Sequence, residues 1–144
     1  GVERVALALR LIGAKSIQAA MDSVRTVLER VARQERTLLS MGWHPYGTPT
    51  GSVPGDPPWR ISGHLSRRVH VYGPHLRGLF RSRVIGWVGN DAVYARIHEL
   101  GGWTGEGHRT YLPPRPHLEP AWRIVRPGVR ATFAHELGKT IRRG

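Results

Sequence analysis

Residues 90–122 read NDAVYARIHELGGWTGEGHRTYLPPRPHLEPAW and carry the strongest local structural signals in the chain. Apolar residues at helical spacing predict a short helix over 91–100, and Gly101 and Gly102 are expected to end it. A polar, glycine-rich loop follows. Four prolines then restrict the backbone and lead into another helix that begins near Pro116. The stretch therefore predicts a rigid segment rather than a mobile catalytic lid.

Upstream, residues 2–12 and 16–40 are predicted to be helical, with Gly13 as a bend or a break between them. In the second segment apolar residues recur at steps of three and four, with an interruption at Glu35. The stripe consists of Ile17, Met21, Val24, Leu28, Val31 and Leu38. A coiled-coil seam would give the same pattern, but packing of one helix against a sheet is the commoner arrangement and is the one we expect.

A long loop is predicted over 42–58, which holds four glycines and five prolines and shows no hydrophobic period. Loops of this length in compact domains are usually functional or disordered. Trp43 and Tyr46 favour docking on a neighbouring surface, whereas the composition alone favours a floppy surface loop. Together with Trp103 in the later glycine-rich loop, these two aromatic residues are our candidates for contact with a partner.

A β-hairpin is predicted after a single turn of helix over 61–68, for which Ser62 is the expected cap. From residue 68 the apolar residues alternate, so a strand runs over 68–72 until Gly73-Pro74 breaks it, and a second strand covers about 79–88. An isolated hairpin is marginally stable in water. We therefore expect this hairpin to pack on the long helix or to extend into a larger sheet.

The C-terminal part is predicted to hold a short third strand over 109–112 and a helix over 116–125. Pro127-Gly128 breaks that helix, and a last helix over 129–141 follows. Its apolar residues stand at four-residue steps and are Val129, Phe133, Leu137 and Ile141.

The predicted fold class is therefore α+β: a long amphipathic N-terminal helix packed on a small antiparallel sheet, with C-terminal helices and a long Gly/Pro-rich loop. A length of 144 residues suits a single domain. Within it we distinguish a helical part (1–41), the loop (42–58), a core of sheet and proline segment (59–126) and a C-terminal helix (127–144).

The chain is strongly basic, with 22 lysine and arginine residues against 10 acidic residues and a net charge of +12. This charge attracts DNA or an acidic partner. However, the basic residues are spread along the chain, and all but Lys15 and Lys139 are arginine, which GC-rich coding also favours. No apolar run approaches the roughly 20 residues needed to cross a bilayer, so no membrane partner is expected.

Catalytic and metal-binding patterns are weak. The chain has no cysteine, and His98 lacks a second histidine four residues away. His108 and His117 flank the proline segment and could meet His98 in space, although the spacing does not require it. Neither a nucleophile elbow nor a phosphate-binding glycine loop is present. We expect no enzyme, cofactor or metal site; a small hydrolase or nuclease built on the histidines is the remaining catalytic alternative.

Three patches of sequence, in this order, resemble the tail-completion or head–tail joining proteins of tailed bacteriophages (virion morphogenesis, minor tail proteins). The matching residues are Pro57, Pro58, Ser62, Gly63, Leu65 and Arg68; Tyr94, Ala95, Ile97, His98, Glu99, Gly101 and Gly102; and Leu112, Pro113, Arg115, Pro116, Leu118, Pro120 and Ala121. They span about residues 57–121. His117 departs from the pattern, because the family usually has an aromatic residue there.

The resemblance implies a structural virion protein without enzymatic activity. It would form a homo-oligomeric ring, with a hexamer as the expected form, at the head–tail junction, where it joins tail to capsid and lines the DNA channel. Its partners would be head connector or adaptor proteins and tail tube or terminator proteins, with non-specific contact to DNA. It would be assembled in the cytoplasm of the bacterial host. A stand-alone basic nucleic-acid-binding protein is the alternative.

The resemblance also implies the residues of an assembly motif: Pro58, Ser62, Gly63, Leu65, Tyr94, His98, Glu99, Gly101, Pro113, Arg115, Pro116 and Pro120. Within this set, Glu99 stands near a helix end and Arg115 between two prolines. A charge-assisted pair between them would tie the helix end to the proline segment, within one subunit or across two. We therefore predict an ion pair between Glu99 and Arg115.

Overall fold

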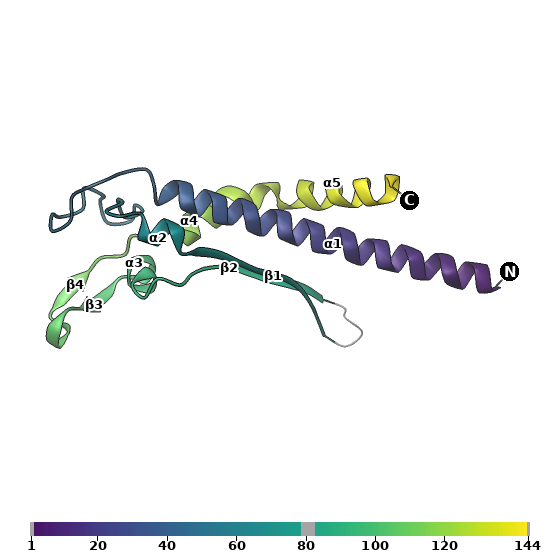
Figure 1. Ribbon diagram of the computed structural model, residues 1–144, viewed down its shortest axis with the longest axis horizontal. Coiled ribbons are helices and arrows are strands. Elements are labelled where there is room, and N and C mark those ends of the chain that lie inside the picture. The colour runs from purple at the N-terminus through teal and green to yellow at the C-terminus, as the bar shows by residue number, and fades with distance from the viewer. Residues whose placement is uncertain (1, 79–82, 144) are drawn as a thin grey trace.

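The computed structural model describes residues 2–78 and 83–143, and for residues 2–12 it describes the backbone alone. The fold is α+β, as predicted (Figure 1). In chain order the elements are α1 (Val2–Leu38), α2 (His64–Arg67), β1 (Val69–Arg77), β2 (Arg83–Asn90), α3 (Ala95–Leu100), β3 (Gly102–Thr104), η2 (Glu106–His108), β4 (Thr110–Leu112), α4 (Leu118–Val125), η3 (Arg126–Gly128) and α5 (Val129–Arg142).

Helix α1 is the central element, and it lies between the β1–β2 hairpin on one side and helix α5 on the other (Figure 1); α4 also packs against it. The predicted packing of the long helix on a sheet is confirmed. Its hydrophobic core joins Ala32 of α1 and Leu39, the residue after α1, to Val69 of β1, with Val71 and Val88 packed against them. The expected bend or break at Gly13 is wrong, because α1 continues through this residue without interruption.

The buried face of α1 is not the apolar stripe alone. Ser23, Ala32 and Glu35 are each at most 1% exposed, whereas Ile17, the first residue of the predicted stripe, is 40% exposed. Small side chains let another helix approach closely, and Ala121 of α4 is likewise fully buried on its side. Glu35, the expected interruption, is therefore part of the packed face, near its C-terminal end.

The β1–β2 hairpin is antiparallel, with Val71 opposite Val88 and Tyr72 opposite Trp87. Strand β1 does not end at Gly73-Pro74. A register shift between Tyr72 and His75 absorbs these residues, and the strand continues to Arg77. The start of the predicted second strand, over 79–82, lies outside the described residues.

A second, smaller sheet consists of β3 and β4, three residues each. The predicted strand over 109–112 is confirmed as β4, whereas its partner β3 lies in what the sequence indicated as a loop. The two strands and η2 between them project from the body of the molecule beside α3 (Figure 1). We call residues 102–112 the arm.

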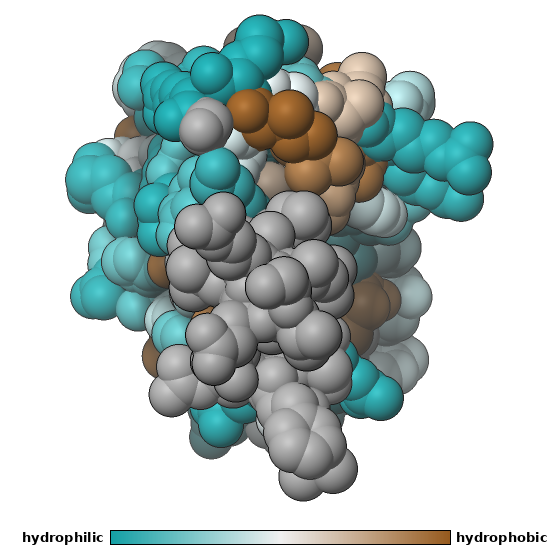
Figure 2. Space-filling view, turned by 90° about the vertical axis from the view of Figure 1, so that its right-hand side faces the viewer, coloured by the Kyte–Doolittle hydropathy of each residue, from teal (hydrophilic) through white to brown (hydrophobic). Residues whose placement is uncertain are grey.

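Helix α5 turns a polar face toward α1. Thr132 and Glu136 are buried there, and the Thr132 hydroxyl accepts a 2.6 Å hydrogen bond from Nη1 of Arg30. The apolar residues that define the helix in the sequence are exposed instead: Phe133, Leu137 and Ile141. Figure 2 views the molecule from the side where both termini lie in Figure 1, and it shows a hydrophobic patch among hydrophilic residues in its upper part.

Residues 42–58 contain no helix and no strand longer than the single bridge between Trp43 and Arg60. They wrap around the side chain of Trp59. A Cβ atom at Gly42 or at Gly51 would collide with its indole ring, so glycine at both positions permits the close approach. None of the described helices is long and apolar enough to cross a membrane.

Candidate functional site

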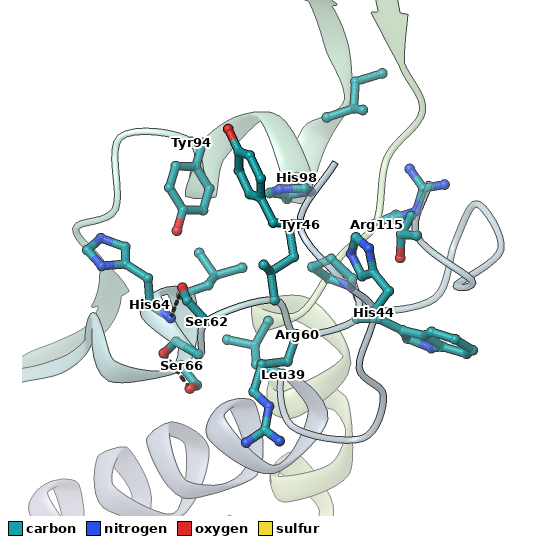
Figure 3. Close-up of a pocket in the computed structure, with 17 residues that line it drawn as sticks. Leu39, His44, Tyr46, Arg60, Ser62, His64, Ser66, Tyr94, His98 and Arg115 are labelled. Atoms are coloured by element: carbon teal, nitrogen blue, oxygen red, sulfur yellow. Dashed lines mark hydrogen bonds between the residues drawn. The ribbon is translucent and has the colours of Figure 1, made fainter. Parts of the chain in front are cut away.

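The three sequence patches converge on one cavity of about 500 Å³ near the C-terminal end of α1 (Figure 3). Loop 42–60, α2, α3 and the proline segment supply its lining. Eight of the predicted site residues line it: Tyr46, Pro58, Ser62, Gly63, Leu65, Tyr94, His98 and Arg115. The lining contains no aspartate or glutamate. The cavity therefore presents aromatic rings, imidazoles and guanidinium groups to an occupant.

Glu99 of α3, the residue after the cavity-lining His98, fixes the start of α4. Its Oε2 accepts hydrogen bonds from the backbone N–H groups of His117 (2.8 Å) and Leu118 (3.0 Å), and its Oε1 accepts one from Glu119 (2.9 Å). These N–H groups belong to a helix N-terminus, where no intrahelical acceptor is available. The carboxylate of α3 thus caps α4, and it does so across the proline segment.

Ionised Glu99 is favoured by this arrangement. Burial of the carboxyl group opposes ionisation, but the three backbone N–H groups and the nearby His117 outweigh it and hold the pKa of Glu99 below its ordinary value of 4.5. A carboxylate that accepts several backbone hydrogen bonds is a strong local anchor. Glu99 is therefore a structural cap with a permanent negative charge at neutral pH.

A second buried contact joins α1 to the start of α4. Nδ1 of His117 lies 2.8 Å from Oε1 of Glu35 and 3.7 Å from Oε2 of Glu99, and His117 and Glu35 are 2% and 0% exposed. We call these three residues, with His98 and Arg115, the polar junction. The sequence did not predict the contact between Glu35 and His117. Two signals pointed to it: Glu35 interrupts an apolar stripe, and His117 replaces an expected aromatic residue.

The predicted ion pair between Glu99 and Arg115 is wrong within the subunit. Arg115 is buried, and its Nε and Nη2 donate to Oγ (3.0 Å) and to the carbonyl oxygen (3.3 Å) of Ser52. Its backbone N–H donates to the carbonyl oxygen of His98 (2.6 Å). Glu99 does tie α3 to the proline segment as expected, but it uses backbone groups. Arg115 instead anchors the Gly/Pro-rich loop.

His98 lines the cavity from α3. Burial, together with the positive charges of His117 and Arg115, lowers the pKa of His98 below its ordinary value of 6.5. The imidazole is therefore neutral at physiological pH, and its buried Nδ1 has no hydrogen-bond partner. Its ring packs edge-on against Tyr94 at a centroid distance of 5.8 Å, and Tyr94 in turn contacts His64 at 5.9 Å.

The remaining predicted residues lie around this centre. Ser62 Oγ accepts a 3.3 Å hydrogen bond from the backbone N–H of His64, although Gly63 occupies the cap position itself. Gly101 ends α3 at a φ of 68°, where a Cβ atom would meet Pro114 at 2.9 Å. Pro113 and Pro116 lie in the segment between β4 and α4, and Pro120 lies in the first turn of α4.

The two tryptophans among the contact candidates lie outside the cavity. Trp43 is 58% exposed and bridges to Arg60, and Trp103 is 60% exposed on the arm. His108 lies in η2 at the tip of the arm and does not join His98 in the cavity lining. No three histidine, aspartate or glutamate side chains in the described part of the chain are arranged to hold a metal ion.

Comparisons of this chain with protein-family models, with curated proteins and with solved structures found no match.

Proposed function

We propose that this protein is a structural subunit of a tailed bacteriophage that forms a homo-oligomeric ring at the head–tail junction. It would join head connector or adaptor proteins to tail tube or terminator proteins around the DNA channel. The sequence patches that resemble tail-completion proteins motivate this proposal. The observation that carries it is the amount of surface that a single subunit leaves exposed.

The accessible surface of the chain is 10,294 Å² for a mass of 16.1 kDa. A compact monomer of this mass exposes about 7,400 Å², so the excess is about 2,900 Å². A subunit in a ring has two neighbours, and a standard interface covers about 800 Å² on each partner. The excess is therefore large enough for two neighbour contacts, with area left for partners above and below.

The character of the exposed surface supports the same proposal. Large apolar side chains are exposed on separate elements, among them Met41, Tyr46, Trp87, Trp103 and Ile141 at 50% or more. Exposed aromatic and methionine side chains are enriched at protein–protein interfaces. The polar junction holds α1, α3 and α4 in a fixed arrangement. A subunit that presents several contact surfaces at once requires such a rigid centre.

The arginines suit a protein next to DNA. Among the described side chains, every arginine except Arg115 is exposed. Those that face the channel of a ring would contact phosphates without reading sequence. Those that face outward would meet acidic partner surfaces.

The test is the mass of the purified protein, measured by native mass spectrometry at increasing protein concentration and after addition of phage heads or tails, with negative-stain images of any large species. A closed ring, alone or on phage parts, is the expected result. Gold-labelled antibody against the protein should then mark the head–tail junction of intact particles.

The alternative function, a stand-alone nucleic-acid-binding protein, rests on the net charge of +12. It predicts a monomer that ignores phage parts and binds DNA with an affinity that falls steeply as salt increases. The slope of log K against log salt counts the phosphates contacted, at about −0.9 per phosphate for duplex DNA. That combination of results would contradict the junction function.

A further inference from the structure

We propose that the arm of one subunit docks into the polar cavity of the next copy, with Trp103 and Glu106 as its contact residues. This inference rests on the proposed ring and names the contact that closes it. It assigns the cavity to an aromatic segment of a second copy of this chain, a segment that carries one glutamate.

The arm is incomplete on its own. Its two strands are three residues long, and Trp103 and Tyr111 pack edge-to-face across them at a centroid distance of 5.3 Å. These rings are 60% and 54% exposed. Short isolated hairpins are marginally stable in water and need a further apolar contact. Figure 1 shows that the arm extends away from the helices of its own subunit.

The cavity is also incomplete. Tyr94, His64 and His98 line it, and the side chain of Tyr46, which is 90% exposed, lies among the residues drawn around it (Figure 3). The buried Nδ1 of His98 has no partner. A pocket of this size, with aromatic walls and a few polar groups, is typical of a site that receives a large side chain.

The arm of the same subunit does not supply that side chain. Leu112, at the end of β4, lines the cavity, so the arm joins the body of the subunit at the edge of the cavity. An arm from another copy has no such restriction. Because arm and cavity are different surfaces of the chain, the contact is heterologous, and repeated contacts of this kind close into a ring when the rotation permits.

Area and charge favour a second copy as the occupant. The excess surface of about 2,900 Å² exceeds what two standard ring contacts would cover on one subunit. The cavity lining includes Arg60, Arg115 and three histidines but no carboxylate, and Glu106 is exposed near the tip of the arm. The tip also carries His108 and Arg109, so the arm has no net negative charge, and it is the side chain of Glu106 alone that would meet the basic groups of the cavity.

The experiment uses an arm variant, Trp103→Ala with Glu106→Arg, and two cavity variants, Tyr46→Asp and Tyr94→Ala. Trp87→Ala, which removes a 50% exposed tryptophan from the β1–β2 hairpin, is the matched control. Circular dichroism identifies the variants that fold. Native mass spectrometry should show rings for the wild type and for Trp87→Ala, and monomers for the arm variant and for each folded cavity variant.

Mixing is the decisive step. The arm variant retains a working cavity, and the cavity variant retains a working arm. An equal mixture should therefore form a dimer of one copy each, and nothing larger. A symmetric interface, in which both copies use the same surface, would not give this result.

Cross-linking provides an independent measurement, because the chain contains no cysteine. Cysteines are placed beside the contact residues, at the exposed Thr110 of the arm and at Ile61 of the cavity lining. Thr110→Cys mixed with Ile61→Cys should give cross-linked dimers with a short bismaleimide, and the double variant should give longer chains. Trp87→Cys mixed with Ile61→Cys should give none.

Rings that survive the arm variant but are lost in Trp87→Ala would overturn the inference and leave the ring itself standing. A wild-type chain that stays monomeric and gives no cross-link would also overturn it. The junction function would then be judged separately, by whether the protein joins heads to tails.

Discussion

Replacing Glu99 tests whether a single carboxylate holds α3 and α4 together. Glu99→Ala leaves the N–H groups of His117 and Leu118, both partly buried, without an acceptor. An unsatisfied donor of this kind costs about 1–3 kcal/mol. Adding the two, and allowing for water that reaches the exposed N–H of Glu119, we expect a loss of about 3 kcal/mol. This corresponds to a decrease in Tm of about 10 °C for a chain of this length.

Glu99→Gln separates charge from hydrogen bonding. The amide oxygen can still accept from two of the three N–H groups, but the charge and one bond are lost, so we expect a smaller loss of about 1–2 kcal/mol. Urea unfolding followed by circular dichroism gives both values. Glu119→Gln is the matched control, because that carboxylate is half exposed and pairs only with Arg123 on the same helix. Its effect should stay below about 0.5 kcal/mol.

Equal losses for Glu99→Gln and Glu119→Gln would refute the role of Glu99 as a cap. A Glu99→Ala protein with wild-type stability would also refute this role, because within the described residues the N–H groups of His117 and Leu118 donate to Glu99 and to no other acceptor.

Two further predictions concern the polar junction, and a third concerns the glycine that ends α3. Because the folded pKa of Glu99 lies below its ordinary value of 4.5, its contribution to stability is complete above that pH and is lost as pH falls through the folded pKa; the difference between wild type and Glu99→Gln, measured by urea unfolding, should therefore shrink on acidification. His117→Phe leaves the buried carboxylate of Glu35 without its partner and should lower the free energy of unfolding by about 3–5 kcal/mol. The double variant with Glu35→Leu should recover much of this loss. A double-mutant cycle that shows no coupling would contradict the pairing. Gly101→Ala forces a side chain into a left-handed backbone position against Pro114 and should lower stability by about 1–3 kcal/mol in thermal unfolding, while Gly13→Ala, in open space on α1, should be neutral or stabilising.

The fold was largely predictable because its main elements are set by local patterns. The helical spacing over 16–40, the alternation after residue 68 and the proline segment all lie within short windows. Each gives the expected kind of structure, although α1 begins at Val2 and β1 continues to Arg77. β3 was missed because three residues of Gly-Trp-Thr contain no alternation, and only pairing with β4 makes them a strand.

The candidate site was less predictable because its contacts are long-range. Glu35 and His117 are 82 residues apart, and nothing in the spacing places one against the other. Arg115 was predicted to pair with Glu99, but the fold brings Ser52 of the distant loop to it. The apolar stripe of α5 was correct as a helix signal, yet it did not indicate which face turns toward α1.

Glu35 lies near one end of α1, so most of this long helix extends to one side of the polar junction. The described side chains of α1 that are buried lie from Ala19 onward, and Glu35 is less than one turn from its C-terminal end at Leu38. About 50 Å of helix separates Glu35 from Val2, at 1.5 Å per residue. A tilt of about 5° at the polar junction would therefore move the far end of α1 by about 4 Å. Because α4, α5 and the β1–β2 hairpin all pack on α1, such a tilt would also change how each of them contacts the helix.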